Sequence, residues 1–278
     1  MVHSRGTSDD GPIPALRDRL PSASHVLCCV DFDGTLAPIE TDPAAVEMTP
    51  GNRNALSQLH RSSAVTVAIV SGRSIADLRR LVDLPVVLAG NHGFELARGG
   101  SRAVHPIARR KAHKVEIVRL HLETILGGVP NLRFENKNLT ATIHLRTVPA
   151  TLRPMVESVT HEVVAGVAPE SVAVTSGKAV LELRPALAWG KGQLVQLLAR
   201  EQPPETCTVV LGDDQTDEDA FKAVESTDIT VLVGPNRPTH ARYRVASPAA
   251  VESVLNWLKT EGTGLLATDS QAESRVSQ

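Results

Sequence analysis

The sequence has few aromatic residues and few cysteines. Phenylalanine, tryptophan and tyrosine together make up 3% of the 278 residues, so a buried core must be built mainly from valine, leucine, isoleucine and alanine. The three cysteines, Cys28, Cys29 and Cys207, are odd in number and lie in apolar runs. We therefore predict buried free thiols in a reducing, cytoplasmic environment, and we expect neither a disulfide framework nor a zinc site.

Long apolar runs and an excess of one charge are also absent. No apolar segment approaches the roughly 20 residues that a membrane-spanning helix needs. The first residues, MVHSRGTSDDGPIP, include no apolar stretch of the signal-peptide type. The formal net charge is only -2. We therefore expect neither a membrane nor a nucleic acid as a partner.

What the sequence does contain is an alternation of short apolar runs with helical patterns. Strands are predicted at 26–30, 65–70, 86–89, 207–211 and 230–233, with helices between them. Continuous apolar strands separated by helices predict a Rossmann-like, doubly wound parallel sheet with helices on both faces. We expect this α/β core to comprise residues 23–103 and 187–262, with a flexible segment at 1–22 and a disordered tail at 263–278.

The stretch from about 104 to 186 has a different pattern. Apolar residues at helical spacing, among them Leu122 and Ile125, predict a helix that ends at Gly127-Gly128. A strand, a second helix and two further strands are predicted at 140–146, 152–163, 171–174 and 179–183. We interpret residues 104–186 as an inserted α+β cap domain with the element order α-β-β-α-β-β, in which one further strand is expected between the two helices.

Polar side chains follow the core strands at the points where these strands end. In chain order they are Asp31 and Asp33 in the segment VDFDGTL, Ser71 at an expected helix start, Lys191 at the start of a later helix, and Asp213 and Asp214. The carboxyl ends of parallel strands meet at the edge of the sheet where ligands bind. We therefore expect these segments to share one site.

The residue types at this edge suit phosphoryl transfer. Three carboxylates close together would repel one another unless a hard cation lay among them, and Mg²⁺ prefers such oxygen ligands. A carboxylate beside this ion can attack a phosphoryl group to give an aspartyl phosphate. A second carboxylate can protonate the leaving alcohol and later activate water. Ser71 and Lys191 would bind the phosphate.

Each segment alone also fits a structural role. The Asp31–Asp33 pair and the Gly212-Asp213-Asp214 segment are compatible with turns, Ser71 with a helix cap, and Lys191 with a solvated side chain. Their shared location at strand ends favours a common function.

These motifs together resemble the haloacid dehalogenase-like phosphatases. The matching segments are D-x-D-G-T at 31–35, a strand that ends in Ser71, Lys191, and G-D-D-x-x-D at 212–217. The resemblance implies that Asp31 is the nucleophile and Asp33 the general acid/base, and that Ser71 and Lys191 hold the phosphate. It also implies that Asp31, Asp213 and the main-chain carbonyl of Asp33 ligate Mg²⁺, supported by Asp214 and Asp217.

Longer segments narrow the resemblance. DFDGTLAPI, SGRSIADL, GNHGFEL and GDDQTDEDAF are similar to the trehalose-6-phosphate phosphatase family, whose inserted unit is a cap that closes over a sugar. The resemblance implies hydrolysis of trehalose 6-phosphate, a sugar phosphate made by a synthase with which this chain would be functionally paired. The implied substrate contacts are Gly34, Arg73, His92 and Glu95 in the core, and Glu135, Lys137, Arg146, Lys178 and Glu182 in the cap.

Spacing alone leaves some of these roles open. Lys178 and Glu182 lie four apart on a strand-like segment, so both would point to one face, and spacing favours a solvated face. His92 and Glu95 fit a loop with a capping histidine equally well. Other functions on this scaffold are hydrolysis of sucrose phosphate or mannosylphosphoglycerate, a phosphomutase, and a regulatory module. The last is disfavoured because all the catalytic acids are present.

Overall fold

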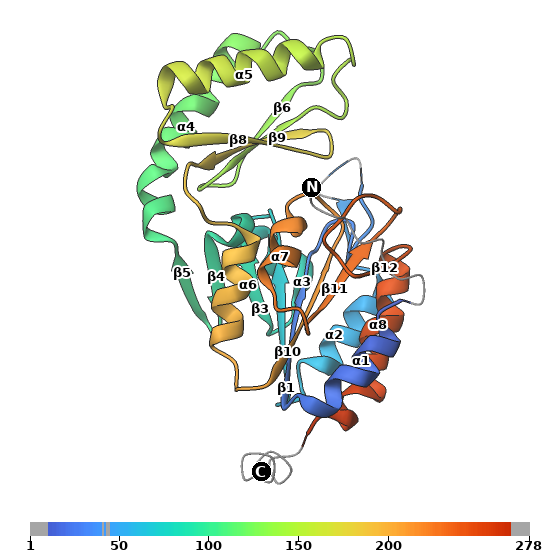
Figure 1. The fold of residues 1–278 in the computed structure, drawn as a ribbon. Helices are drawn as coiled ribbons and strands as arrows, with labels where there is room; N and C mark the ends of the chain where they lie inside the picture. The colour runs from blue at the N-terminus through green and yellow to red at the C-terminus, as the bar shows by residue number, and fades with distance from the viewer. Residues whose placement is uncertain (1–10, 41, 43–44, 268–278) are drawn as a thin grey trace.

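Two β-sheets organise the chain (Figure 1). The structure is a computed structural model, and it describes residues 11–40, 42 and 45–267. The larger sheet has eight strands in the order β12-β11-β10-β1-β2-β3-β4-β5, and the smaller has four in the order β6-β7-β9-β8. The predicted fold class, an α/β core with an inserted α+β unit, is confirmed.

Most of the larger sheet is parallel. Its parallel strands are β1 (His25–Val30), β2 (Val65–Val70), β3 (Val87–Gly90), β10 (Thr206–Gly212), β11 (Ile229–Val233) and β12 (Tyr243–Val245). All six residues of β1 are buried, because helices cover both faces of this central strand. The antiparallel strands β4 (Glu95–Arg98) and β5 (Ser101–Val104) extend one edge. The sequence analysis missed these two strands because β5 is mostly exposed and no apolar run marks it.

Helices cover the two faces of the larger sheet. Residues of α1 (Ile13–Arg19), α2 (Pro50–Leu59), α3 (Ile75–Val82) and α8 (Pro248–Thr260) pack on one face, and residues of α6 (Lys191–Arg200) and α7 (Asp217–Ala223) on the other. The start of α2 shows why such helices form where they do: the Thr49 side chain accepts a hydrogen bond from the Asn52 N–H, and Pro50 occupies the first helical position. None of the helices in the described ranges is long and apolar enough to cross a membrane.

Both ends of the described chain pack against the core, which corrects two predictions. Residues 11–22 are not flexible, because α1 and the 3-10 turn η1 (Leu20–Ser22) bury Leu16 and Leu20 completely. Near the other end, η4 (Gly262–Leu265) is followed by Ala267, whose N–H donates to the Ala23 carbonyl at 2.8 Å. Residues 263–267 are therefore ordered, and residues 1–10 and 268–278 lie outside the described ranges.

The smaller sheet belongs to the inserted unit. Its elements are α4 (Pro106–Leu126), β6 (Arg133–Asn136), β7 (Ala141–His144), α5 (Arg153–Val167), β8 (Val172–Gly177) and β9 (Val180–Pro185). Both helices pack on one face of the sheet, and α5 covers the side turned away from the core (Figure 1). These elements lie between residues 104 and 186, and we propose this range as the extent of the inserted unit, which we call the cap.

Two details of the cap differ from the predictions. Ile125 was expected on the buried stripe of α4 but is 57% exposed, and Leu126 is buried in its place. Lys178 was expected on the same strand as Glu182. It lies instead in the two-residue turn between β8 and β9, where Ala179 has a φ of 59°. The pairing of Gly177 with Val180 closes this hairpin and turns Lys178 toward the core.

Candidate active site

A cavity of about 780 Å³ lies between the carboxyl ends of the parallel strands and the cap sheet. It brings together most of the residues predicted to form the site. Those that line it are Asp31, Asp33, Ser71, Arg73, His92, Glu135, Lys137, Arg146, Lys178, Glu182, Lys191, Asp213 and Asp214. The predicted residues that do not line it are Gly34, Glu95 and Asp217.

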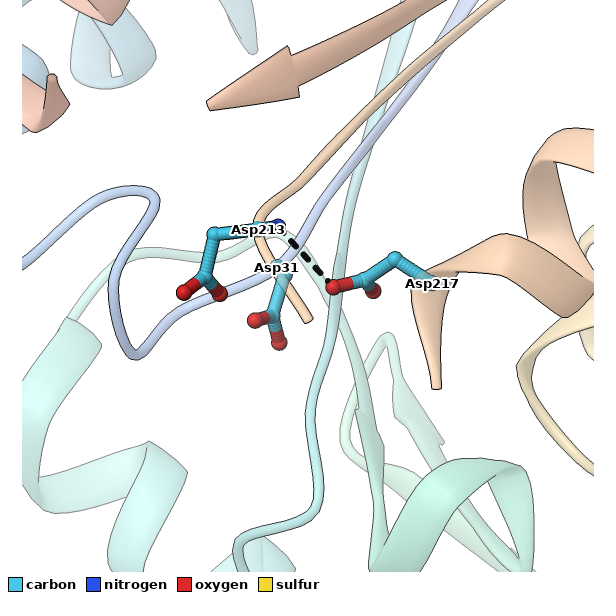
Figure 2. A group of neighbouring side chains, drawn as sticks. All are labelled: Asp31, Asp213 and Asp217. Atoms are coloured by element: carbon cyan, nitrogen blue, oxygen red, sulfur yellow. Dashed lines mark hydrogen bonds between the residues drawn. The ribbon is translucent and has the colours of Figure 1, made fainter. Parts of the chain in front are cut away.

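Three buried aspartates meet at the core end of this cavity. Asp31 follows β1, Asp213 follows β10, and Asp217 begins α7, and one carboxylate oxygen of each lies within 4.8 Å of the others (Figure 2). Burial raises the pKa of Asp31 well above its usual value, and burial raises the pKa of Asp213 to about 6. Such a group of buried acids is stable as carboxylates only beside positive charge.

Lys191 supplies one of these positive charges. Its side chain is 3% exposed, and its Nζ donates to Asp31 Oδ1 at 2.8 Å and to Asp217 Oδ1 at 2.7 Å. Burial opposes the ammonium form, but the charges of Asp217 and Asp31 outweigh burial and raise the pKa of Lys191. Lys191 is therefore charged and fixed beside the predicted nucleophile.

Asp217 is suited to orient its neighbours. Its Oδ2 accepts hydrogen bonds from the N–H groups of Asp213 and Asp214, both at 3.0 Å, while its Oδ1 is bonded to Lys191. Both oxygens are thus occupied, and Asp217 is not among the residues that line the cavity. Arg237, which the sequence analysis missed, donates to the main-chain carbonyls of Asp213 and Asp214 at 3.3 and 3.2 Å and so fixes the same loop.

The donor atoms in this cluster fit a hard divalent cation. Asp213 Oδ1 is buried without a hydrogen-bond partner among the described residues, although its carboxylate also contacts Lys178. Two cavity-lining carboxylates from the ends of neighbouring strands offer the oxygen ligands that such ions prefer. A cation bound here would offset both the loss of hydration and the mutual repulsion that raise the pKa values of Asp31 and Asp213.

Asp33 is more exposed than Asp31 and is held by Arg73. The guanidinium donates from Nε and Nη2 to the two Asp33 oxygens, both at 2.7 Å. Arg73 also stacks over the Phe32 ring at 5.6 Å. This two-point pair fixes the orientation of the Asp33 carboxylate at the cavity wall.

The sequence predicted that Ser71 begins a helix, but Ser71 lies in a loop. The loop follows β2, and α3 begins only at Ile75, with Ser74 as its N-cap. The Ser71 side chain is nearly fully buried, and its Oγ accepts a hydrogen bond from the Arg73 N–H at 3.2 Å. The helix begins later because Ser74 is the better cap. Its Oγ accepts a hydrogen bond from the Asp77 N–H and donates one to the Asp77 carboxylate.

The cap contributes a wall of polar and charged groups. Alternate residues of its strands face the cavity, while the residues between them, such as Ile143 and Leu181, pack on the cap helices. Lys137 Nζ and Thr142 Oγ1 donate to Glu182 Oε1 at 3.2 and 2.7 Å. Glu182 is 9% exposed, so the solvated face that spacing favoured is wrong.

A second polar pair lies beside this one. His144 Nε2 lies 2.9 Å from Glu135 Oε2. Burial opposes the carboxylate form of Glu135, but hydrogen bonding to His144 and the charges of Lys137 and Arg73 together lower its pKa. Arg146 is exposed at the cavity rim. The sequence analysis missed Thr142 and His144, although the alternation in Thr140-Ala141-Thr142-Ile143-His144 was the signal that places them on one face.

Gly34 has a structural role in place of the predicted substrate contact. Its φ is +82°, and a Cβ at this position would lie 2.2 Å from Asp213 Oδ2. The glycine is therefore required so that the loop after β1 can approach the aspartate.

Glu95 also differs from its prediction. Its side chain is 1% exposed, accepts hydrogen bonds from the Ile75 N–H at 3.1 Å and from Asn91 Nδ2 at 2.8 Å, and pairs with Arg102. The chain reverses at the end of β3, so β4 carries Glu95 to the start of α3 and away from the cavity.

His92 does line the cavity. It has a φ of 58° and is buried, and neither ring nitrogen has a partner among the described residues. Burial, reinforced by Arg184, Lys191 and Lys137, lowers the pKa of His92 well below its usual value. The imidazole is therefore neutral and offers one donor and one acceptor to a ligand.

Comparison with known proteins agrees with this geometry. The family model described as trehalose-phosphatase matches residues 29–249. A trehalose-phosphate phosphatase of Mycobacterium marinum is 36% identical over 248 residues, which cover 86% of this chain and 60% of that protein. The chain thus spans about 60% of the length of this curated relative.

Solved structures show the same relationship. The C-terminal domain of a Candida albicans trehalose-6-phosphate phosphatase has a TM-score of 0.77 at 25% identity and covers 93% of this chain and 99% of its own. A trehalose-6-phosphate phosphatase related protein has a TM-score of 0.75 at 27% identity, with coverages of 86% and 99%. The family match, the curated relative and the solved structures agree, and this chain belongs to the trehalose-phosphatase family.

Proposed function

We propose that this chain hydrolyses trehalose 6-phosphate to trehalose and phosphate. The observation that carries the proposal is the position of the buried Asp31–Lys191 pair, with Asp33 beside it, at one end of a cavity whose opposite wall is polar. The core end suits a phosphate ester, and the cap wall offers the hydrogen-bonding groups that sugar hydroxyls need. Family membership supports this substrate.

We assign the covalent step to Asp31. One Asp31 oxygen attacks phosphorus, and the bond between phosphorus and the sugar oxygen breaks, which leaves the phosphoryl group on Asp31. Ser71 and Lys191 bind the phosphoryl oxygens, and Lys191 already donates to Asp31. Asp31 directly follows β1 and is bonded to Lys191 at the core end of the cavity, which supports this assignment.

We assign proton transfer to Asp33. It gives a proton to the leaving sugar oxygen and then takes one from a water molecule whose oxygen attacks the phosphoryl group on Asp31. Phosphate is released and Asp31 is restored. Because Arg73 holds both Asp33 oxygens, substrate binding must free one of them.

We propose Mg²⁺ as the cofactor, held by Asp31, Asp213 and the main-chain carbonyl of Asp33. It would neutralise charge on the phosphate during transfer. Asp214 and Asp217 would support these ligands, as the hydrogen bonds of Asp217 to the loop indicate. In the cap, Glu135, Lys137, Arg146, Lys178 and Glu182 would contact the sugar phosphate, together with Arg73 and His92 from the core.

A synthase that makes trehalose 6-phosphate would supply the substrate, and we propose a functional pairing with such an enzyme. We also propose a cytoplasmic location. The three cysteines are free and buried, as predicted, which suits a reducing compartment.

A phosphate-release screen tests the function. The purified chain with Mg²⁺ is given trehalose 6-phosphate, sucrose 6-phosphate and mannosylphosphoglycerate, and we expect the highest kcat/KM with trehalose 6-phosphate and equal amounts of phosphate and trehalose. Equal or faster turnover of another ester would overturn the substrate assignment. An isomerised sugar phosphate without free phosphate would indicate a phosphomutase.

A further inference from the structure

The turn that connects β3 to β4 has a strained backbone beneath the cavity. It is formed by η3 (Asn91–Gly93), in which Asn91, His92 and Gly93 have φ values of 50°, 58° and 93°. A left-handed φ at two successive residues other than glycine, Asn91 and His92, is unfavourable unless surrounding contacts hold them. Asn91 is fully buried, and its side chain makes several of those contacts.

On the core side, Asn91 is bonded to the phosphate loop, by which we mean Ser71-Gly72-Arg73. Its N–H donates to the Arg73 carbonyl at 2.7 Å. Its Nδ2 donates to Glu95 Oε2 at 2.8 Å, and the same Glu95 oxygen accepts from the Ile75 N–H at the start of α3. Glu95 thus fixes the Asn91 amide relative to the helix that follows the phosphate loop.

On the cap side, the same amide is bonded to the loop at 137–140. Nδ2 also donates to the Lys137 carbonyl at 3.2 Å, and Oδ1 accepts from Thr140 Oγ1 at 2.6 Å. The Lys137 side chain in turn donates to Glu182 at the cavity wall. Asn91 therefore joins the phosphate loop, through its main-chain N–H, to the Lys137–Glu182 pair, through its side-chain amide.

We propose that Asn91 is a positioning residue that sets the distance between the phosphate loop and the Lys137–Glu182 pair. The inference rests on the proposed function, because it assigns these two groups to the two ends of one substrate. A sugar phosphate spans both ends of the cavity, whereas a small phosphate ester reaches only the phosphate loop. Asn91 therefore contributes to the selection of large hydroxylated phosphate esters.

The substitution Asn91→Gly tests the proposal. Glycine accepts the left-handed φ without strain, so the change removes the amide contacts and keeps the backbone path. We expect KM for trehalose 6-phosphate to rise by about 10- to 100-fold, because a displaced cap wall no longer matches the substrate. The kcat/KM for p-nitrophenyl phosphate, which has no sugar, should stay within about twofold.

The chain offers a matched control and a milder variant. Asn138→Gly changes another asparagine at a left-handed φ, 69°, in the same cap loop, but Asn138 is exposed, and both substrates should be turned over normally. Thr140→Val removes only the hydroxyl that donates to Asn91, and should raise KM for trehalose 6-phosphate less than Asn91→Gly does. Thr140→Ser, which keeps a hydroxyl, should restore the natural KM for trehalose 6-phosphate. The double variant Asn91→Gly/Thr140→Val should show less than the summed effect.

Two results would overturn the proposal: an equal loss of activity on both substrates, or no change in either. If Asn91→Gly does not fold, the two Thr140 variants test the proposal instead. A KM for trehalose 6-phosphate that is the same for Thr140→Val and Thr140→Ser would overturn it. If the natural chain prefers another sugar phosphate, that ester replaces trehalose 6-phosphate in every comparison. An error in the substrate assignment is therefore seen in the natural chain, and an error in the role of Asn91 only in the variants.

Discussion

At the scale of single residues, Lys191 organises the acids of the site. It is buried between Asp31 and Asp217, and its ammonium is bonded to both. Asp217 in turn accepts hydrogen bonds from the N–H groups of Asp213 and Asp214. The ammonium of Lys191 therefore helps to fix the aspartates that follow both β1 and β10. Buried charges of this kind are stable only as a connected set, because removal of one member leaves another unpaired.

The two aspartates of the β1 loop should fail in different ways when each is changed to asparagine. With p-nitrophenyl phosphate, Asp31→Asn should lower kcat by about 10³-fold or more and release no burst of p-nitrophenol, because the amide cannot form the phosphoryl bond. Asp33→Asn should give a burst of one p-nitrophenol per chain followed by slow turnover. This leaving group needs no proton, whereas the attack of water still requires the base. Rapid-mixing absorbance measurements distinguish the two.

Asp18→Asn, a change of an exposed carboxylate on α1, is the matched control and should leave both phases intact. Circular dichroism should show the same fold for all three variants. A fully active Asp31→Asn, or an Asp33→Asn that is slow without a burst, would contradict the assigned roles.

At the scale of elements, the strands of the core were predictable and the contacts between units were not. The run Val26–Val30 is apolar throughout, and the aspartates that follow it mark a strand end, so the position of Asp31 could be predicted. Asn91 bonds to groups 46 and 49 residues further along the chain, and one of these is a main-chain carbonyl with no side-chain signal. The resemblance assigned Glu95 to the substrate, and the sequence could not correct this because the partners of Glu95 come together only in the folded chain.

The start of β1 should make stability depend on pH. His25 is 7% exposed and its Nε2 lies 2.9 Å from Thr66 Oγ1; because that hydroxyl donates to Gln202, the imidazole is the donor. Burial lowers the pKa of His25 from its usual 6.5. Below about pH 6.5 the unfolded chain therefore binds a proton that the folded chain does not, and the free energy of unfolding should fall as the pH decreases.

Urea unfolding of the natural chain and of His25→Gln at pH 7.5 and 5.5 measures this effect. The variant should flatten the dependence by at most about 1.4 kcal/mol per pH unit, the limit for one proton. His113→Gln, at an exposed position of α4, should keep the natural slope. Equal slopes for His25→Gln and the natural chain would refute a role for His25.

At the scale of the whole molecule, the cavity joins two units of unlike character. The core end concentrates buried carboxylates, and the cap wall carries paired charges and hydroxyls. Lys178, in the turn of the cap hairpin, contacts Asp213 and so connects the cap to the acidic end. Asn91 makes another connection, to the cap loop at 137–140.

The acidic end should make the stability of the folded chain depend on Mg²⁺. A ligand that binds only the folded chain adds about 2.7 kcal/mol at 100 times its dissociation constant. For a chain of this size we expect that gain to raise Tm by about 5 °C. Asp213→Asn should remove the shift in Tm. It should leave the Tm without metal equal or higher, because it removes a carboxylate that burial and neighbouring aspartates destabilise. Differential scanning calorimetry with and without Mg²⁺, with NaCl at matched ionic strength as the control, measures both values. An Asp213→Asn variant that Mg²⁺ still stabilises to the natural extent would show that the ion binds elsewhere.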